Sequence, residues 1–389
     1  MKRSILILSL CAVAFAFTSE QKPDPKKSLN IAREHLENRL KSYFDTLRFP
    51  RTMNADTMVA VDSRDWTSGF YSGVLWQMYD YTKDKKWEQA ARKWTSGLEK
   101  EKYNTNTHDL GFMLYCSFGN GLHLTNDPAY KDILIQGAKS LCTRFNAKAG
   151  VIKSWDHGKG QYLVIIDNMM NLEFLFWATK VTGDSSFYKI AVTHANTTMK
   201  NHFRADNSSY HVLNYDTETG KVISKKTAQG YADESAWARG QAWGLYGYTM
   251  TYRETKDKKY LDQAVKIADF FLNHRNLPKD KVPYWDFNAP DIPNTQRDAS
   301  AAAIAASGLL ELGGYVKDGK KYIQAAEEML TSLSSPAYLA KLNTNQNFIL
   351  MHSVGHKPAK SEIDVPINYA DYYYVEALMR YDRWILAKK

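Results

Sequence analysis

One short unit recurs five times along the chain and constrains the fold more than any other feature. Each copy places an Asp in the turn after one apolar helical pattern and an aromatic residue where the next pattern begins. The Asp residues of the five copies are Asp84, Asp127, Asp184, Asp257 and Asp318. Their spacing averages roughly 60 residues, which is enough for two helices and two connections. The repeat therefore predicts helical hairpins that are stacked or arranged in a ring.

Twelve segments have apolar residues at the i, i+3, i+4 spacing of helices. They are 29–48, 69–82, 86–99, 109–124, 128–145, 168–182, 185–203, 235–254, 258–274, 299–315, 320–334 and 367–386. Twelve helices match six hairpins closed in a ring, which is an all-α (α/α)6 barrel, and an open solenoid is the alternative. Strand-like pieces are fewer: 161–166, 210–214 and 221–224.

Long segments at 150–166, 204–234 and 275–298 lie on the connections that lack the repeated turn. We therefore expect one tight end of the barrel and one end with long loops, which is where binding and catalytic residues gather. No linker or change in composition divides the chain after the N-terminus. Residues 21–389 are predicted to form a single catalytic domain.

Residues 1–20 have the pattern of a secretory signal. Lys2 and Arg3 precede an apolar run that ends at Phe17, with small residues near its end. The run is too short for a convincing membrane span. Cys11 faintly resembles a lipoprotein site, but Leu10 before it makes lipidation the less favoured reading. The chain is predicted to be exported, into a periplasm or beyond.

Two further cysteines, Cys116 and Cys142, lie in helical patterns of the exported part. Export permits a disulfide between them, and two buried free thiols are the alternative. No metal site is expected, because no other cysteine is available to join them. The chain also lacks a phosphate-binding glycine loop, a serine nucleophile elbow and a His-Glu-x-x-His motif, so no cofactor is expected.

The formal net charge of the 389-residue chain is +9, which favours an anionic partner. Its basic clusters are short and interrupted by Asp, so they indicate solvated turns rather than a nucleic-acid surface. The 10 Trp and 25 Tyr residues offer rings that can fill a core or stack on sugars. An acidic glycan fits both features.

Two carboxylates stand next to apolar runs. The run Gln161–Ile166 ends at Asp167, immediately before a helical pattern, and His108-Asp109 opens another. Such an Asp is either a helix N-cap or an acid whose pKa is raised by burial, and Asp167 taken alone favours the cap. Two of them in Trp-rich surroundings favour glycoside chemistry, which needs a pair of carboxyl groups.

The densest polar and aromatic stretch runs from Gln229 to Trp243. Arg239 and Trp243 are four residues apart, so a helix would place them on one face as a carboxylate-binding fork and a stacking ring. A packed Arg–Trp contact is the alternative. Further candidates in polar segments are Trp66, Trp155, His211 and a late loop from Ser353 to Lys357, which could contact an anionic group.

Four motifs in order resemble glycoside hydrolase family 88, the unsaturated glucuronyl hydrolases. They are His108-Asp-Leu-Gly-Phe112, Ile166-Asp-Asn-Met-Met-Asn-Leu172, Gln229–Trp243 and Ser361-Glu-Ile-Asp-Val-Pro366. The resemblance covers nearly the whole mature chain. It implies an (α/α)6 barrel that removes the non-reducing terminal 4,5-unsaturated uronic acid from oligosaccharides released by lyases from glycosaminoglycans.

The resemblance also implies roles for single residues. Asp167 would protonate C4 of the double bond and activate the water that adds at C5, and Asp109 would be its essential partner. The residues that would contact the unsaturated uronate are His108, His211, Gln229, Arg239, Trp66, Trp155 and Trp243. The loop from Ser353 to Lys357 lies where some members meet a sulfate. The family includes cytoplasmic enzymes, so the signal segment is a departure in location.

Three other functions compete with this one. A rhamnogalacturonyl hydrolase of pectin breakdown would share the fold and the chemistry but act beside a different sugar. An inverting glycosidase would act on a saturated glycan with an acid and a base carboxyl. A non-catalytic periplasmic glycan-binding protein would use the Trp and Arg residues for capture alone.

Overall fold

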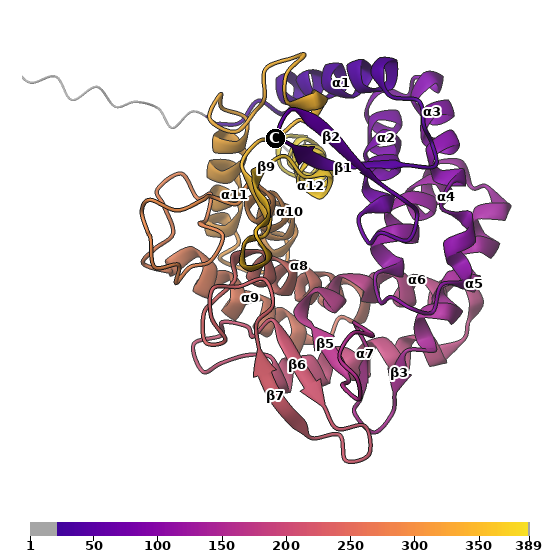
Figure 1. The fold of residues 1–389 in the computed structure, drawn as a ribbon, viewed down its shortest axis with the longest axis vertical. Helices are drawn as coiled ribbons and strands as arrows, with labels where there is room; N and C mark the ends of the chain where they lie inside the picture. The colour runs from indigo at the N-terminus through magenta and orange to yellow at the C-terminus, as the bar shows by residue number, and fades with distance from the viewer. Residues whose placement is uncertain (1–21, 388–389) are drawn as a thin grey trace, which may run out of the picture.

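The computed structural model describes residues 22–387, and this part of the chain is mostly helical (Figure 1). Its twelve α-helices are α1 (Pro25–Ser42), α2 (Ser68–Thr82), α3 (Lys85–Ser96), α4 (Asn120–Thr125), α5 (Pro128–Cys142), α6 (Leu172–Thr182), α7 (Ser185–Asn201), α8 (Ala238–Thr255), α9 (Lys258–Asn273), α10 (Ala299–Gly313), α11 (Lys320–Leu333) and α12 (Asn368–Arg380). Each overlaps one of the twelve predicted segments, so the helical fold class is confirmed, although the first helix spans Pro25–Ser42 rather than 29–48. The predicted signal segment, residues 1–20, lies outside the described residues.

Three of the predicted helices change their winding along their length. A π-helix, η2 (Gly111–Gly119), precedes α4, and a 3-10 helix, η3 (Ile166–Asn171), precedes α6. A second π-helix, η6 (Tyr381–Leu386), continues α12. Shorter 3-10 turns are η1 (Glu99–Tyr103), η4 (Asn345–Asn347) and η5 (Lys357–Ala359). A π-turn or 3-10 turn next to an α-helix often marks a functional segment.

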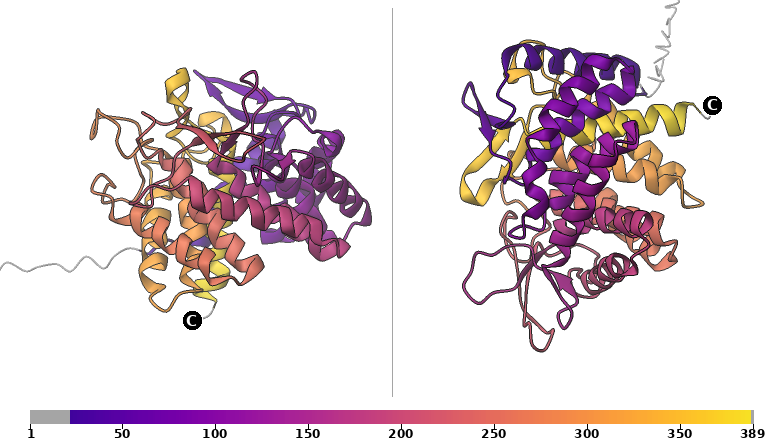
Figure 2. Two further views of the ribbon diagram at one scale, coloured as in Figure 1. Left: turned by 90° about the horizontal axis from the view of Figure 1, so that it is seen from below. Right: turned by 90° about the vertical axis from the view of Figure 1, so that its right-hand side faces the viewer.

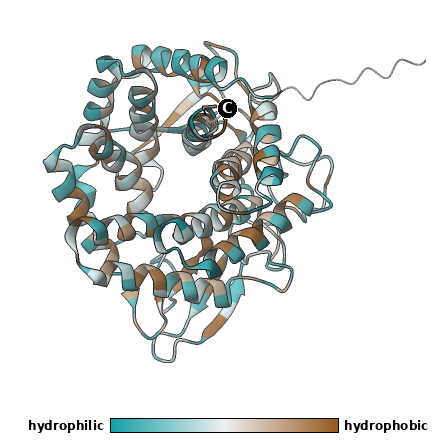
Figure 3. Ribbon diagram, turned by 180° about the vertical axis from the view of Figure 1, so that it is seen from behind, coloured by the Kyte–Doolittle hydropathy of each residue, from teal (hydrophilic) through white to brown (hydrophobic). Residues whose placement is uncertain are grey.

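The helices alternate between inner and outer positions. The inner ones are α2, η2 with α4, η3 with α6, α8, α10 and α12, and every residue of α10 is buried. The outer helices, such as α3 and α9, bury one face only. Hydrophobic and hydrophilic residues therefore alternate along each of them (Figure 3). Neighbouring inner helices contact one another in chain order, and α12 also contacts α2. Buried apolar residues from Leu29 to Tyr381 form the largest core cluster.

The repeated turn is built by the residues that define it. The hydroxyl of Thr82 donates to the carbonyl of Met78 (2.7 Å) and accepts from the amide of Asp84, whose carboxylate caps α3 at the amide of Lys86 (3.0 Å). Between them, Lys83 has a φ of 56°. The turns at Asp184 and Asp257 repeat this pattern.

The other two turns differ in part. Asp127 caps α5 in the same way. Asp318 does not cap α11, whose N-cap is Gly319. Gly319 packs so closely against the Gly313 carbonyl that a Cβ atom would overlap it. The aromatic residue of each repeat is buried, and an aromatic or large aliphatic side chain buried in this way contributes about 1.5–3 kcal/mol to stability.

Short antiparallel strands occupy the long connections. They are β1 (Phe49–Asn54) with β2 (Thr57–Val61), β3 (Phe145–Asn146) with β4 (Val151–Ile152), the sheet β5 (Leu163–Ile165), β6 (Val212–Tyr215) and β7 (Val222–Lys226) in the order β5-β6-β7, and β8 (Ser353–His356) with β9 (Ser361–Val365). The three predicted strands are β5, β6 and β7. All nine strands lead into inner helices, and they gather at the end of the molecule opposite the C-terminus (Figure 2).

Cys116 and Cys142 are free thiols, so the disulfide alternative is wrong. Burial raises the pKa of the Cys142 thiol to about 12 and that of Cys116 further. Both thiols therefore stay protonated and unreactive. Within residues 22–387, no helix is long and apolar enough to cross a membrane.

Candidate active site

Asp167 lies inside the 3-10 helix η3 and does not cap a helix. The N-cap of η3 is Ile165, and that of α6 is Asn171. The capping alternative is therefore wrong for Asp167. The strand β5 leads directly into η3 and places the carboxyl at the end of the molecule that carries the long connections. Asp167 is buried there, with 6% of its surface exposed.

Asp109 is brought beside the Asp167 segment by a close approach of two helices. The amide of Phe112 donates to the side-chain oxygen of Asn171 (3.0 Å). A Cβ at Gly111 would lie 2.6 Å from that oxygen, so only glycine allows this contact. The start of η2 is thus joined to the end of η3, which brings together the segments that carry the two carboxylates.

The pKa of Asp167 is raised to about 7, chiefly because burial disfavours the charged carboxylate. Arg239 opposes the shift, Asp109 adds to it by like-charge repulsion, and Trp243 opposes it slightly. One carboxylate oxygen, Oδ2, has no hydrogen-bond partner within the described chain. The group can therefore hold a proton near neutral pH and donate it to a substrate.

His211 presents a fixed tautomer to this carboxyl. Its Nδ1 accepts from the amides of Ala228 (3.1 Å) and Gln229 (3.2 Å), so the proton of the neutral ring resides on Nε2. That nitrogen lies 3.8 Å from Oδ2 of Asp167. Burial lowers the pKa of His211 well below its usual range, and the positive charge of Arg239 lowers it further. His211 is therefore a neutral donor that faces the acid.

Asp109 has its own polar neighbours. Nε2 of His108 lies 3.3 Å from Oδ1 of Asp109, and the hydroxyl of Thr107 donates to Oδ2 (3.0 Å). His108 is fully buried, and burial lowers its pKa, although Asp109 opposes the shift. The ring is therefore neutral. Arg144 acts on His108 on this side of the site, and Arg239 acts on Asp167.

Arg239 lies in the first turn of α8 and is locked in place. Its guanidinium donates to Asp298 (3.3 Å), to the side chain of Gln229 (2.5 Å) and to the carbonyls of Val354 and Gly355 (2.7 Å for the second). It lies over the ring of Trp237, 4.5 Å from the ring centre. Trp243, the ring predicted to stack on a sugar, is fully buried and packs on Phe112 (5.1 Å between ring centroids).

The other predicted aromatic residues line the same region. Trp66, half-buried before α2, contacts Tyr369 (5.0 Å between ring centroids) and Phe112 (5.6 Å). Trp155 meets the ring of His211 edge to face (5.7 Å). The rings thus border the two carboxylates from different connections.

The late loop forms strand β8 and the turn after it. The buried hydroxyl of Ser353 has no partner among the described residues. Lys357 donates to the side chains of Thr295 (2.8 Å) and Gln296 (2.5 Å). Between them, Val354 and Gly355 bind Arg239, so this loop belongs to the same site.

The sequence interpretation missed two residues that hold the site together. Asp298 caps α10 through Ser300 and binds Arg239, and its place before a helical pattern was a usable signal. Arg144 donates to the carbonyls of Thr105 and Lys153, which joins the segments that carry Asp109 and Trp155. Nothing in the sequence around Arg144 indicates this contact.

The arrangement suits a small anionic substrate. Inner helices start beside the site, and helix N-termini favour negative charge. Arg239 adds a fixed cation, and Asp167 adds an acid. Within residues 22–387, no group of three or more His, Cys, Asp or Glu side chains could hold a metal ion.

The sequence model of Glycosyl Hydrolase Family 88 matches residues 45–387. The chain belongs to this family. The family 88 chain is 48% identical over 393 residues to an unsaturated glucuronyl hydrolase of Formosa agariphila, with 98% of each chain covered.

Solved structures agree with this assignment. A crystal structure of an unsaturated glucuronyl hydrolase specific for heparin has a TM-score of 0.91 and 52% identity, covering 94% of this chain and 98% of that one. A Streptococcus agalactiae unsaturated glucuronyl hydrolase, an Asp-to-Asn variant complexed with dGlcA-GalNAc6S, has a TM-score of 0.81 and 30% identity, with 98% of each chain covered.

Proposed function

We propose that this family 88 enzyme removes the non-reducing terminal 4,5-unsaturated uronic acid from glycosaminoglycan oligosaccharides made by lyases. The observation that carries the proposal is the buried Asp167 carboxyl, with a pKa of about 7 and one oxygen that has no hydrogen-bond partner within residues 22–387. Protonating an alkene carbon needs an acid that keeps its proton near neutral pH. The Formosa agariphila relative is an unsaturated glucuronyl hydrolase, and the Streptococcus agalactiae variant binds dGlcA-GalNAc6S.

The reaction is the addition of water to a vinyl ether. Asp167 gives its proton to C4, and the positive charge that develops at C5 is shared with the ring oxygen. Water adds at C5 and returns a proton to Asp167. The resulting hemiketal opens, and the aglycone leaves with its oxygen protonated, so the acid ends the cycle in its starting state.

The neighbouring residues position this step. Arg239 and the helix N-termini stabilise the uronate carboxylate, and Asp109 orients the sugar while its charge helps Asp167 keep its proton. Neutral His211 donates from Nε2 toward the reacting group. Gln229, Trp66 and Trp155 complete the subsite. His108 and Trp243 are fully buried and act through the residues that they contact, Asp109 and Phe112.

The late loop is proposed to contact the sugar beyond the uronate. Both partners of the Lys357 ammonium, Thr295 and Gln296, are uncharged, so its positive charge is available to an anion. The Ser353 hydroxyl, which has no hydrogen-bond partner within residues 22–387, lies in strand β8, which ends just before Lys357. A sulfate on the neighbouring sugar is the anion that we propose for this loop.

The twelve helices are proposed to form a closed (α/α)6 barrel within a single domain. Contact between α2 and α12, the first and last inner helices, supports closure.

The enzyme is further proposed to work after export, for which the N-terminal pattern is the support. N-terminal sequencing of the enzyme recovered from a periplasmic fraction would test export, and an intact Met1 would contradict it.

The test is loss of the ultraviolet absorbance of the conjugated alkene. We expect the enzyme to consume unsaturated disaccharides from heparin or chondroitin and to leave pectin-derived ones unchanged. Asp167→Asn should lower kcat by about 10²- to 10⁴-fold, the usual contribution of a general acid, and retain binding. Asp184→Asn, in an exposed N-cap that Asn also fills well, is the matched control.

Four results would contradict the proposal. Consumption of the pectin product alone would assign the rhamnogalacturonyl reaction. Cleavage of a saturated glycoside would indicate direct glycosidic displacement. Unchanged turnover in Asp167→Asn would remove this residue from the chemistry, and binding without turnover by the parent would indicate a glycan-binding protein.

A further inference from the structure

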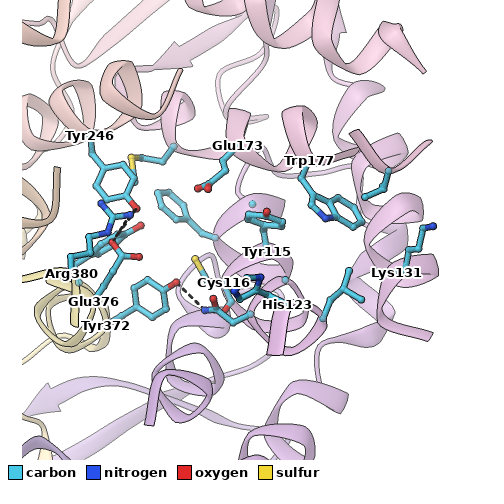
Figure 4. Close-up of a pocket in the computed structure, with 18 of the residues that line it drawn as sticks. Tyr115, Cys116, His123, Lys131, Glu173, Trp177, Tyr246, Tyr372, Glu376 and Arg380 are labelled. Carbon is cyan, nitrogen blue, oxygen red and sulfur yellow. Dashed lines mark hydrogen bonds and ion pairs between the residues drawn. The ribbon is translucent and has the colours of Figure 1, made fainter. Parts of the chain in front are cut away.

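A cavity of about 560 Å³ lies among the inner helices, and its lining does not include Asp109, Asp167 or Arg239 (Figure 4). Its walls come from η2, α4, α6, α8 and α12. They include Val181 and Arg380, which lie at the C-terminal ends of α6 and α12. Phe112 lines it and also contacts the rings of Trp66 and Trp243, so an aromatic layer separates the two spaces. Its volume is within the range of small-molecule sites, about 300–1,000 Å³.

The charges beside this cavity do not balance. Arg253 pairs with Glu173, Glu254 and Glu311, and Arg380 pairs with Glu311 and Glu376. Lys180 adds one more cation on Glu254. The four carboxylates of this paired network therefore share three cations, which leaves the network with one negative charge in excess. Lys131 also lines the cavity, at its mouth, and forms no ion pair with the network among the described residues.

Glu173 is the carboxylate of this network that exposes negative charge to the cavity. It lines the cavity, and only one of its oxygens is bonded to Arg253. Burial raises its pKa, and repulsion from Glu254, Glu311 and Glu376 adds to the shift although Arg253 opposes it. An additional cation in the cavity would relieve this repulsion.

Aromatic rings and an unused hydroxyl complete the walls. Tyr115 and Trp177 lie 5.9 Å apart between ring centroids and face the cavity with Tyr372 (Figure 4). Tyr373 also lines it, is 2% exposed, and has no hydrogen-bond partner for its hydroxyl within residues 22–387. This hydroxyl is therefore available to a ligand that enters the cavity.

We propose that this cavity binds a small organic ammonium ion that carries a hydroxyl group. The cationic head would lie between the carboxylates of Glu173 and Glu376 and the aromatic faces, which attract such cations. The hydroxyl group would bond to Tyr373. A bare metal ion fits less well, because the described residues offer no cluster of metal ligands.

The test is a calorimetric titration of the full chain with choline chloride. The control ligand is 3,3-dimethylbutan-1-ol, which has the same shape without the charge. We expect saturable binding of choline and none of the neutral compound. Asp167→Asn saturated with an unsaturated disaccharide should bind choline equally well, because the two spaces are separate.

Variants of the cavity distinguish a built site from a chance contact. Glu173→Gln should weaken choline binding about tenfold or more, since a contact to a charged group contributes roughly 1.5–3 kcal/mol. Tyr373→Phe keeps the ring packing and should weaken binding severalfold. Lys131→Ala removes an exposed cation at the mouth of the cavity and should bind choline at least as tightly as the parent.

Thermal melting shows which variants are folded, and Tyr373→Phe serves as the decisive variant if Glu173→Gln fails to fold. The proposal is overturned by the absence of choline binding, by equal binding of the neutral compound, or by displacement of choline by the disaccharide. Unchanged binding in Tyr373→Phe also overturns it, since the hydroxyl contact is part of the site.

Discussion

At Asp167, burial raises the pKa of the carboxyl while Arg239 and Trp243 lower it, and the balance lies at about 7. Asp109 adds a repulsion that favours the protonated form. The catalytic value of the residue therefore depends on groups from other parts of the chain. The residues next to Asp167 in the sequence contribute only the apolar run that precedes it.

The pH dependence of turnover should report this balance. We expect kcat to fall as pH rises through about 7, because only protonated Asp167 can donate to C4. The measurement is kcat from alkene loss between about pH 5 and pH 9. The residual rate of Asp167→Asn should lack this alkaline limb, and an alkaline limb unchanged in that variant would contradict the assignment.

The same shift has a consequence for stability. The folded-state pKa of about 7 exceeds the ordinary value of 3.8, so the folded protein binds this proton more tightly than the unfolded chain. The resulting stabilisation is full below the ordinary value and is lost as pH rises through 7. Asp167→Asn has no charge to bury, so it should be more stable than the parent at pH 8 by about 1–4 kcal/mol.

Urea unfolding at two pH values measures this difference. Near pH 4 the Asp167 carboxyl of the folded parent is protonated, so the parent and Asp167→Asn should have similar free energies of unfolding. A parent that is more stable than the variant at pH 8 would show that the buried carboxylate is compensated by contacts other than those described.

At the scale of elements, α10 and α8 are joined through one side chain. Asp298 caps α10 with one oxygen and holds Arg239 of α8 with the other. Asn at this position keeps a capping oxygen and removes the charge, so Asp298→Asn isolates the second role.

We expect Asp298→Asn to lower kcat/KM about tenfold or more, mainly through KM, because Arg239 loses a buried charged partner. Steady-state kinetics with the unsaturated disaccharide provide the measurement. Asp257→Asn, the exposed N-cap of α9, should leave kcat/KM unchanged. Equal losses in the two variants would indicate a general effect on folding, and full activity in Asp298→Asn would show that Arg239 needs no such partner.

Local elements were the most predictable part of the fold. The hairpin turns could be read from sequence because Thr82 and Asp84 form their bonds within a few residues. Asp318 did not follow the pattern, because close packing of Gly319 on Gly313 set that turn instead. The two-residue strands β3 and β4 have no periodicity to detect, and the π-winding of η2 resembles an ordinary helix in sequence.

At the scale of the whole molecule, the site is assembled from connections that lie far apart in the chain. Asp109 and Asp167 could be proposed separately, since each follows a local pattern. Contacts such as that of Arg239 with the Val354 carbonyl join residues more than a hundred positions apart and involve a backbone atom that has no residue signature. Only the arrangement of the inner helices determines these contacts.

That arrangement makes a prediction about α2, which lies between η2 and α12. A Cβ at Gly73 would lie 2.6 Å from the Cys116 carbonyl of η2 and 2.6 Å from the ring of Tyr372 on α12. Gly73→Ala should therefore destabilise the fold by about 1–3 kcal/mol, because both neighbours must shift.

Gly244 in α8 is the matched control, since the nearest atoms to its Cβ would lie 3.6 Å or more away. Gly244→Ala should be neutral or stabilising by up to about 1 kcal/mol, the usual gain of Ala over Gly in a helix. Both changes bring the same helix propensity, so the difference between their free energies of unfolding reports packing between α2, η2 and α12. Equal stabilities would contradict the contact between the first and last inner helices on which closure of the ring depends.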